Sequence, residues 1–96
     1  MRWRICFTPS SEADLRCYRV FEQRAIVDAI KVHLAVDAGI ETTRRKRLHE
    51  HPIATWELRV GEHRVFYELG EATITVVAVG HKEHNDLFIR GKKVEL

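Results

Sequence analysis

The stretch Trp56-Glu57-Leu58-Arg59-Val60-Gly61-Glu62-His63-Arg64-Val65-Phe66-Tyr67 decides the fold, because apolar and polar side chains alternate on both sides of a central Gly-Glu pair. Alternation with a period of two is typical of half-buried strands, and glycine in a two-residue turn favours a hairpin. With such a turn, two apolar pairs face each other: Leu58 with Val65, and Trp56 with Tyr67. The stretch therefore predicts an antiparallel hairpin with one apolar face, and it places Trp56 in the core.

The other face of this hairpin carries too much positive charge, because Arg59 falls directly across from Arg64. Like charges opposed across strands destabilise a sheet by roughly a few tenths of a kcal/mol unless something neutralises them. Two interpretations stay open. Either Glu57 and Glu68 pair with the arginines, or the two guanidiniums share an anion, most naturally a phosphate, which arginine binds through paired hydrogen bonds. Phe66 lies on the same face, where it could stack on a base or fill space against the C-terminal segment, and we expect the second.

A second hairpin is expected around Gly70-Glu71. The segment 72–79 is apolar on both faces, as is typical of a central strand. With a two-residue turn, Tyr67 lies opposite Ile74 and Val65 lies opposite Val76. A register shift of one residue would mix the faces, so the agreement across two turns supports this pairing. The register places three residues of the last strand on the face of the arginines: Val77, Val79 and His81.

Upstream of the hairpins, the pattern predicts one strand and two helices. Residues 2–7 alternate, and Thr8-Pro9-Ser10 interrupts the alternation. Ser11 and Asp14 have a spacing that resembles a capping box, which would open a first helix. A second helix is expected over roughly 22–37, and together the two form a helical hairpin. The apolar stripe of the second helix is Ile26, Ile30 and Leu34.

The composition predicts one ordinary globular domain over residues 1–96. Hydrophobic residues make up 45% of the chain and charged residues 31%. No apolar run is long enough to cross a bilayer, and the N-terminus lacks the pattern of a signal peptide. We therefore expect a cytoplasmic protein without a membrane partner. Cys6 and Cys17 form neither a disulfide framework nor a metal-ligand spacing.

The net charge of +2 is too small for strong attraction of the whole molecule to nucleic acid. Any such binding must come from local clusters, of which Arg44-Arg45-Lys46-Arg47 is the clearest. This run is either a solvated loop or a clamp for a nucleic-acid backbone, which would fix position and not sequence. The clamp would use four side chains: Arg44, Arg45, Lys46 and Arg47.

The segment His81-Lys82-Glu83-His84-Asn85 follows the last apolar strand and supplies groups that move protons. Histidine gains and loses a proton near neutral pH, and arginine stabilises the charge that builds on a phosphate. Together with the arginine pair, His81, Lys82 and His84 could cleave a phosphodiester without a metal. The alternative is that both histidines are simply exposed. No carboxylate or cysteine lies near them at a familiar metal-ligand spacing, so we expect no metal site.

The hairpin with its Leu-Arg, glycine turn and following Arg-apolar strand resembles the RelE/ParE toxin superfamily over nearly the whole chain. The resemblance implies an α+β fold, in which an N-terminal strand and a two-helix hairpin pack on a curved antiparallel sheet of three to five strands. It implies a cognate antitoxin, with operator DNA bound only through that partner. It also implies cleavage of mRNA on the ribosome by 2′-hydroxyl attack, with no metal or other cofactor.

Some site residues follow from the resemblance position by position. Arg64 matches the arginine that contacts the scissile phosphate. Arg59 is not part of this match, and its assisting role follows from its expected position across from Arg64. Lys82 stands where the RelE type commonly has an arginine, and Phe88 stands where it often has a catalytic tyrosine. Because phenylalanine has no hydroxyl, Phe88 could stack on a base but could not move a proton. The missing tyrosine keeps two alternatives open: a ParE-type poison of DNA gyrase, and a non-catalytic co-repressor that only binds an antitoxin.

Overall fold

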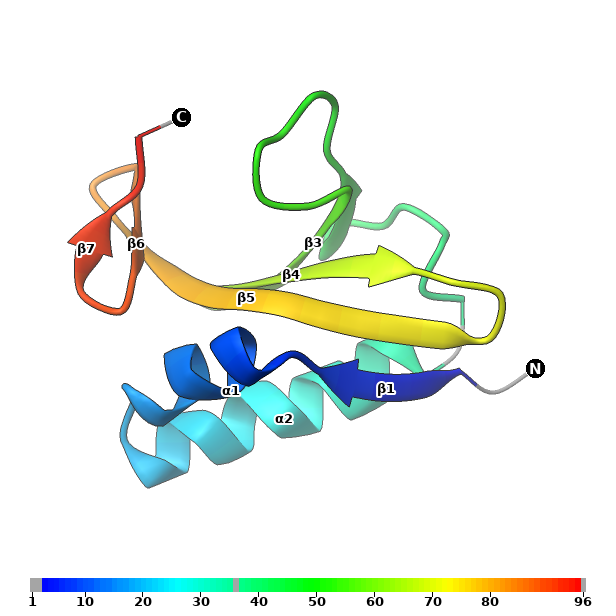
Figure 1. The fold of residues 1–96 in the computed structure, drawn as a ribbon, viewed down its shortest axis with the longest axis horizontal. Helices are drawn as coiled ribbons and strands as arrows, with labels where there is room; N and C mark the ends of the chain where they lie inside the picture. The colour runs from blue at the N-terminus through cyan, green and yellow to red at the C-terminus, as the bar shows by residue number, and fades with distance from the viewer. Residues whose placement is uncertain (1–2, 36, 96) are drawn as a thin grey trace.

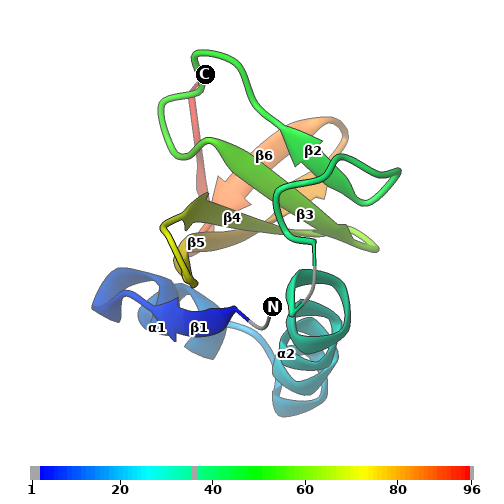
Figure 2. The same ribbon diagram turned by 90° about the vertical axis from the view of Figure 1, so that its right-hand side faces the viewer.

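A computed structural model describes residues 3–35 and 37–95, in which two helices cover one face of a bent sheet (Figures 1 and 2). The chain begins with the short β1 and then forms both helices before the rest of the sheet. The elements are β1 (Arg4–Phe7), α1 (Pro9–Arg16), α2 (Val20–Leu34), β2 (Arg45–Arg47), β3 (Trp56–Val60), β4 (His63–Leu69), β5 (Thr73–Glu83), β6 (Asp86–Ile89) and β7 (Lys92–Lys93).

The sheet follows the order β2-β3-β4-β5-β6-β7, and neighbours along this path are antiparallel. The N-terminal strand β1 is the exception, because it pairs with the first part of β5 in parallel. The described residues form seven strands, more than the three to five expected. The additional strands are β2, β6 and β7, which are two to four residues long, too short for an alternating pattern to stand out in the sequence.

The hairpin predicted from the opening stretch is confirmed. Leu58 pairs with Val65, Trp56 with Tyr67 and Arg59 with Arg64. Gly61 has a φ of 59°, a left-handed conformation that glycine adopts at no steric cost.

The register predicted for β4 and β5 is wrong, for two reasons. Leu69 pairs with Ile74, so the turn has four residues and not two. A bulge then follows, because Phe66 pairs with Ala78 while its neighbour Tyr67 pairs with Val76. One extra residue in a strand turns every later side chain to the opposite face. Val79 therefore packs in the core beneath the helices, and not on the face of the arginines.

The predicted helices are present, although the first begins earlier than expected. Thr8 is its N-cap, and its hydroxyl oxygen accepts a hydrogen bond from the Ser11 N–H at 3.0 Å. Pro9 occupies the first turn, where its missing N–H costs nothing. The capping box expected at Ser11 is therefore wrong. The predicted stripe of α2 is confirmed, since its three members are fully buried: Ile26, Ile30 and Leu34.

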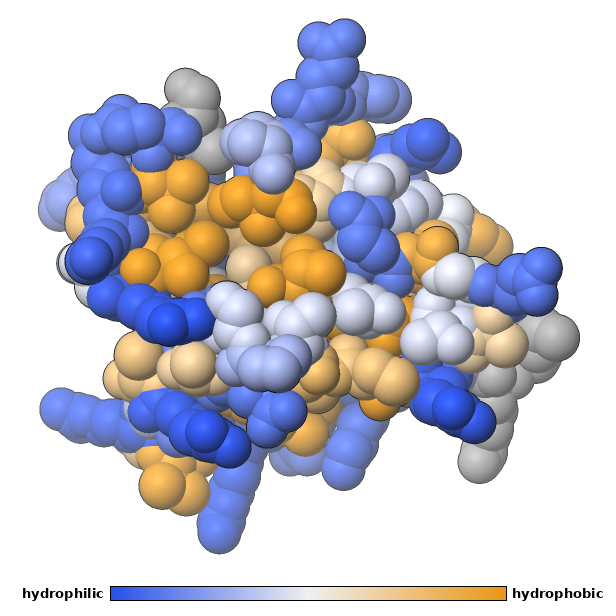
Figure 3. All heavy atoms as spheres, in the orientation of Figure 1, coloured by the Kyte–Doolittle hydropathy of each residue, from blue (hydrophilic) through white to orange (hydrophobic). Residues whose placement is uncertain are grey.

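Two apolar clusters lie on opposite faces of the sheet. The larger lies under the helices and includes Trp56, as predicted. The smaller contains Phe66 and Leu87, which confirms that Phe66 packs against the C-terminal segment. Figure 3 shows apolar side chains gathered over the middle of the molecule, with hydrophilic side chains projecting around them. Within the described ranges, no helix has the length and apolar character needed to span a membrane.

Candidate functional site

A groove of about 600 Å³ runs over the sheet face that lies away from the helices. Its walls come from segments far apart in the chain: the basic strand β2 and the loop after it, the β3–β4 hairpin, and the turn between β5 and β6. The lining residues are Lys46, Leu48, His51, Glu57, Arg59, Glu62, Arg64, Lys82, His84 and Asn85. The groove contains four cationic and two acidic side chains among these, so it favours an anionic ligand.

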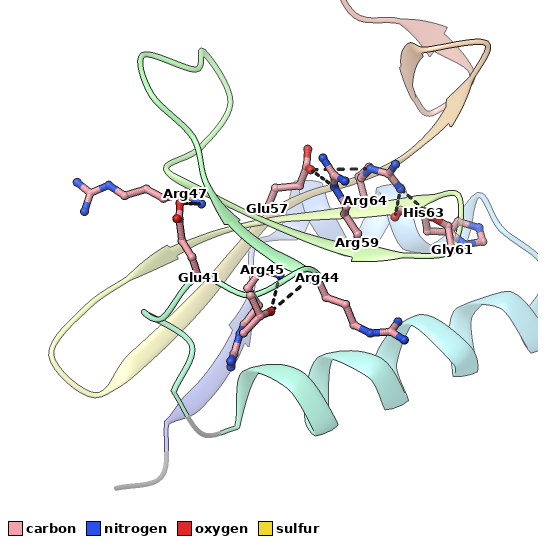
Figure 4. A network of polar contacts seen from close by, with 10 residues as sticks. Glu41, Arg44, Arg45, Arg47, Glu57, Arg59, Gly61, His63 and Arg64 are labelled. Atoms are coloured by element: carbon pink, nitrogen blue, oxygen red, sulfur yellow. Dashed lines mark hydrogen bonds and ion pairs between the residues drawn. The ribbon is translucent and has the colours of Figure 1, made fainter.

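A buried carboxylate, that of Glu57, contacts both arginines of the hairpin (Figure 4). Oε1 of Glu57 is 3.4 Å from Nε of Arg59 and 3.8 Å from Nε of Arg64. Glu57 is only 7% exposed. The interpretation that Glu57 pairs with both arginines is therefore confirmed. Glu68 does not share this role, because its carboxylate accepts a hydrogen bond from the Thr55 N–H at 3.1 Å.

Arg64 is held more firmly than Arg59. Its Nη1 donates to the carbonyl oxygens of Gly61 and His63, at 2.8 and 2.9 Å. Its side chain is 14% exposed, against 47% for Arg59. Its Nε is buried and has no hydrogen-bond partner among the described residues, since Glu57 is too far for one. A buried donor of this kind costs free energy until a ligand or water accepts from it.

The basic run does not act as one cluster. Its last three residues form the strand β2 and not a solvated loop, and only Lys46 of its four members lines the groove. Arg45 donates from Nη1 to the His33 carbonyl at the end of α2, at 2.8 Å. Arg47 extends away from the arginine pair in Figure 4, while its N–H donates to Glu41. Because neighbouring residues of a strand point to opposite faces, one strand cannot turn all four side chains to one ligand.

His81 lies on the opposite face from the arginines, so its predicted position is wrong. The bulge in β5 turns it toward the helices, where Nδ1 lies 2.7 Å from the hydroxyl of Tyr18. Burial is the main cause that raises the pKa of Tyr18 to about 12, so its hydroxyl keeps its proton at neutral pH. Nε2 of His81 lies 3.0 Å from a carboxylate oxygen of Glu83. Both ring nitrogens of His81 are therefore engaged away from the groove.

Phe88 follows His81 to that opposite face. The two residues pair across β5 and β6, and their rings stack with centroids 5.6 Å apart. The structure does not bring Phe88 to the groove, whereas Lys82 and His84 do line it beside Arg59 and Arg64. His84 and Asn85 form the turn between β5 and β6, with φ values of 52° and 72°. This left-handed pair makes the tight turn that carries the imidazole of His84.

Four residues that were given no role in the site from the sequence also line the groove: Leu48, His51, Glu62 and Asn85. The ring of His51 stacks on Phe66 with centroids 5.6 Å apart, and its Nδ1 accepts the Ile53 N–H at 3.2 Å. The only signal in the sequence was that His51 follows the basic run within a polar segment. No group of three potential metal ligands is found in the described part of the chain. The expectation of a site without a metal stays a prediction.

Comparison with known proteins gives one family and several related folds. Residues 5–86 match the family model described as "ParE toxin of type II toxin-antitoxin system, parDE". No sequence of a curated protein matches the chain.

Solved structures that resemble this fold include three toxin–antitoxin complexes, each at low sequence identity. One is the toxin–antitoxin complex RelBE2 from Mycobacterium tuberculosis, with a TM-score of 0.73, 20% identity, and coverage of 85% of this chain and 100% of that one. The archaeal RelE–RelB complex from Pyrococcus horikoshii OT3 has a TM-score of 0.64 and 15% identity, covering 82% and 93%. The RelB–RelE complex from Methanococcus jannaschii has a TM-score of 0.61 and 18% identity, covering 79% and 88%. At these identities the likeness concerns the fold alone, and the predicted fold class is confirmed.

Proposed function

The chain belongs to the ParE toxin family of type II toxin–antitoxin systems, and on this premise we propose that it is an endoribonuclease that cleaves mRNA on the ribosome. The observation that carries the proposal is the cross-strand pair of Arg59 and Arg64 in a groove with His84 and Lys82. Two guanidiniums fit a phosphate, and an imidazole beside them can exchange a proton with the substrate.

The proposed reaction is attack of a ribose 2′-hydroxyl on the adjacent phosphate, with no metal. Arg64 is the main phosphate ligand, because two backbone carbonyls already fix its guanidinium and its Nε has no hydrogen-bond partner among the described residues. Arg59 assists as the more exposed partner. Charge that develops on the phosphate oxygens is stabilised by these donors and by the ammonium of Lys82. His84 donates a proton to the departing 5′-oxygen.

We also propose that an antitoxin covers the protein, and that operator DNA is bound only through that partner. The three solved structures compared above are complexes of a toxin with its antitoxin. A neighbouring reading frame for a short partner with a DNA-binding segment would support this assignment. Its absence would weaken it.

The ribonuclease proposal is tested by inducing the protein in growing cells and by adding it to ribosomes programmed with mRNA. The wild type should arrest growth and cut the mRNA. Arg64→Ala should lower the cleavage rate about 10²- to 10³-fold, the typical cost of removing one donor from a developing oxyanion. Arg24→Ala is a matched control, because Arg24 is an exposed arginine of α2 and its loss removes the same charge on the helix side. If Arg64→Ala cut mRNA as fast as the wild type, the proposal would be wrong.

A gyrase poison of the ParE type is the second candidate, favoured by the family model that the chain matches. Pulse labelling separates the two, because a ribonuclease stops protein synthesis first and a gyrase poison stops DNA synthesis first and leaves mRNA whole. A non-toxic co-repressor would cause no growth arrest at all.

A further inference from the structure

We propose that Glu57 accepts the proton of the attacking 2′-hydroxyl, an inference that rests on the ribonuclease function proposed above. Cleavage by 2′-hydroxyl attack needs one group that accepts a proton and a second group that donates one. The sequence supplied histidines and a lysine for both tasks. The structure leaves only part of that set in the groove and adds a carboxylate at its centre.

The position of Glu57 is the first argument. Glu57 lies on β3, and its Oε1 is 3.4 Å from Nε of Arg59 and 3.8 Å from Nε of Arg64. Lys46 is its cross-strand neighbour on β2. A phosphate bound by the two guanidiniums would therefore lie against this carboxylate, and the ribose attached to that phosphate would bring its 2′-hydroxyl close to Oε1.

His84 is assigned above to the 5′-oxygen as the proton donor, and the remaining groups of the groove are poor proton acceptors. Nδ1 of His51 already accepts the Ile53 N–H, so Nε2 carries the hydrogen of the neutral ring and can only donate. A lysine ammonium such as that of Lys82 is protonated at neutral pH and has no lone pair to offer. Glu62 is exposed in the β3–β4 turn at the rim. Glu57 is the carboxylate that lies at the phosphate position.

The step balances with Glu57 and His84 in these roles. Glu57 takes the proton from the 2′-hydroxyl while the 2′-oxygen of the ribose forms a bond to phosphorus. The bond between phosphorus and the 5′-oxygen breaks, and protonated His84 gives its proton to that oxygen. The products are a 2′,3′-cyclic phosphate and a free 5′-hydroxyl, with Glu57 protonated and His84 neutral. Solvent then restores both groups by a proton exchange, and no electron is transferred to or from the protein.

Glu57→Gln tests the role, because glutamine keeps the size and a hydrogen-bonding oxygen for the arginines but cannot take the proton at that oxygen. Single-turnover cleavage on programmed ribosomes should fall about 10²- to 10⁴-fold. Binding of a fully 2′-O-methylated RNA, which lacks the nucleophile, should stay equal or become tighter, because one negative charge leaves the groove. Glu57→Asp should recover part of the cleavage rate. Glu71→Gln is the matched control, because it makes the same change of charge in the exposed β4–β5 turn, outside the groove, and it should cleave as the wild type does.

Three outcomes would overturn the inference. If Glu57→Gln bound RNA more tightly and cleaved it at the wild-type rate, the carboxylate would only compete with phosphate for the arginines. If binding and cleavage fell together by the same factor, Glu57 would only position the arginines. If the wild type itself cut no RNA, the ribonuclease function would fail and this inference with it. The first two results leave the ribonuclease function intact, so the two failures are distinguishable.

Discussion

Replacing Gly80 by alanine should destabilise the protein and disturb the groove together. Gly80 lies on β5 opposite Arg64, next to the point where β6 folds back along the sheet. A Cβ at this position would lie 2.5 Å from the Phe88 carbonyl oxygen and 2.9 Å from Cγ1 of Ile89. Ordinary contact begins near 3.4 Å, so the backbone of β6 would have to move by about 0.9 Å.

The size of the effect follows from that displacement. Overpacking costs about 1–3 kcal/mol, and a clash with backbone belongs at the upper end because a strand cannot rotate away as a side chain can. Alanine also lowers the conformational entropy of the unfolded chain, which offsets this cost by about 0.4–1 kcal/mol. We therefore expect Gly80→Ala to lower the free energy of unfolding by about 2 kcal/mol, a large part of the roughly 5–15 kcal/mol of a typical domain.

Urea unfolding followed by tryptophan fluorescence measures this change. Gly61→Ala is the control: it meets no atom within 4 Å, and its φ of 59° should cost about 1 kcal/mol through backbone strain alone. Gly80→Ala should also shift the amide resonances of residues 84–89 and slow mRNA cleavage, because His84 is carried by the same turn. A Gly80→Ala protein within about 0.5 kcal/mol of the wild type, with unchanged resonances, would refute the packing argument.

The remaining predictions concern the helix side of the sheet. Asp14→Ala should lower the free energy of unfolding by about 2 kcal/mol, because the carboxylate accepts the buried Val79 N–H, and a chemical denaturation curve that matches the wild type would contradict this. Burial raises the pKa of Tyr18 to about 12 and that of Tyr67 further, so the folded state holds both protons more tightly than the unfolded chain does. The contribution of these two hydroxyls to the free energy of unfolding is complete below about pH 10 and is lost as the pH rises through 12. The urea midpoint should therefore fall over that interval, and the two tyrosines should leave it level at lower pH. Phe88→Tyr should leave the mRNA cleavage rate unchanged, since that ring stacks on the face away from the groove, and a faster reaction would show that the segment rearranges on the ribosome.

Local sequence patterns were sufficient to predict how an element faces the core where one face of that element is apolar and the other is not. The stripe of α2 and the alternation of β3 and β4 each admit one orientation toward the core, so burial, register and the Arg59–Arg64 pair could all be predicted. The helix start at Thr8 was missed because Ser11 and Asp14 offered a second capping pattern. Asp14 is instead buried beneath β5, where it holds the Val79 N–H and the guanidinium of Arg90.

The sequence by itself determined the arginine pair, because a two-residue turn fixes which residues face each other. It could not determine which groups join that pair. The segment 72–79 is apolar on both faces, so nothing in its pattern reveals an extra residue at Val77. Tertiary contacts decided the bulge. With the bulge, Val79 lies beneath the helices, where its N–H donates to Asp14 and its side chain packs in the core. Side chains along a strand alternate between two opposite faces, so the extra residue at Val77 places His81 and Phe88 on the helix side of the sheet. The same shift leaves Lys82 and His84 beside the arginines.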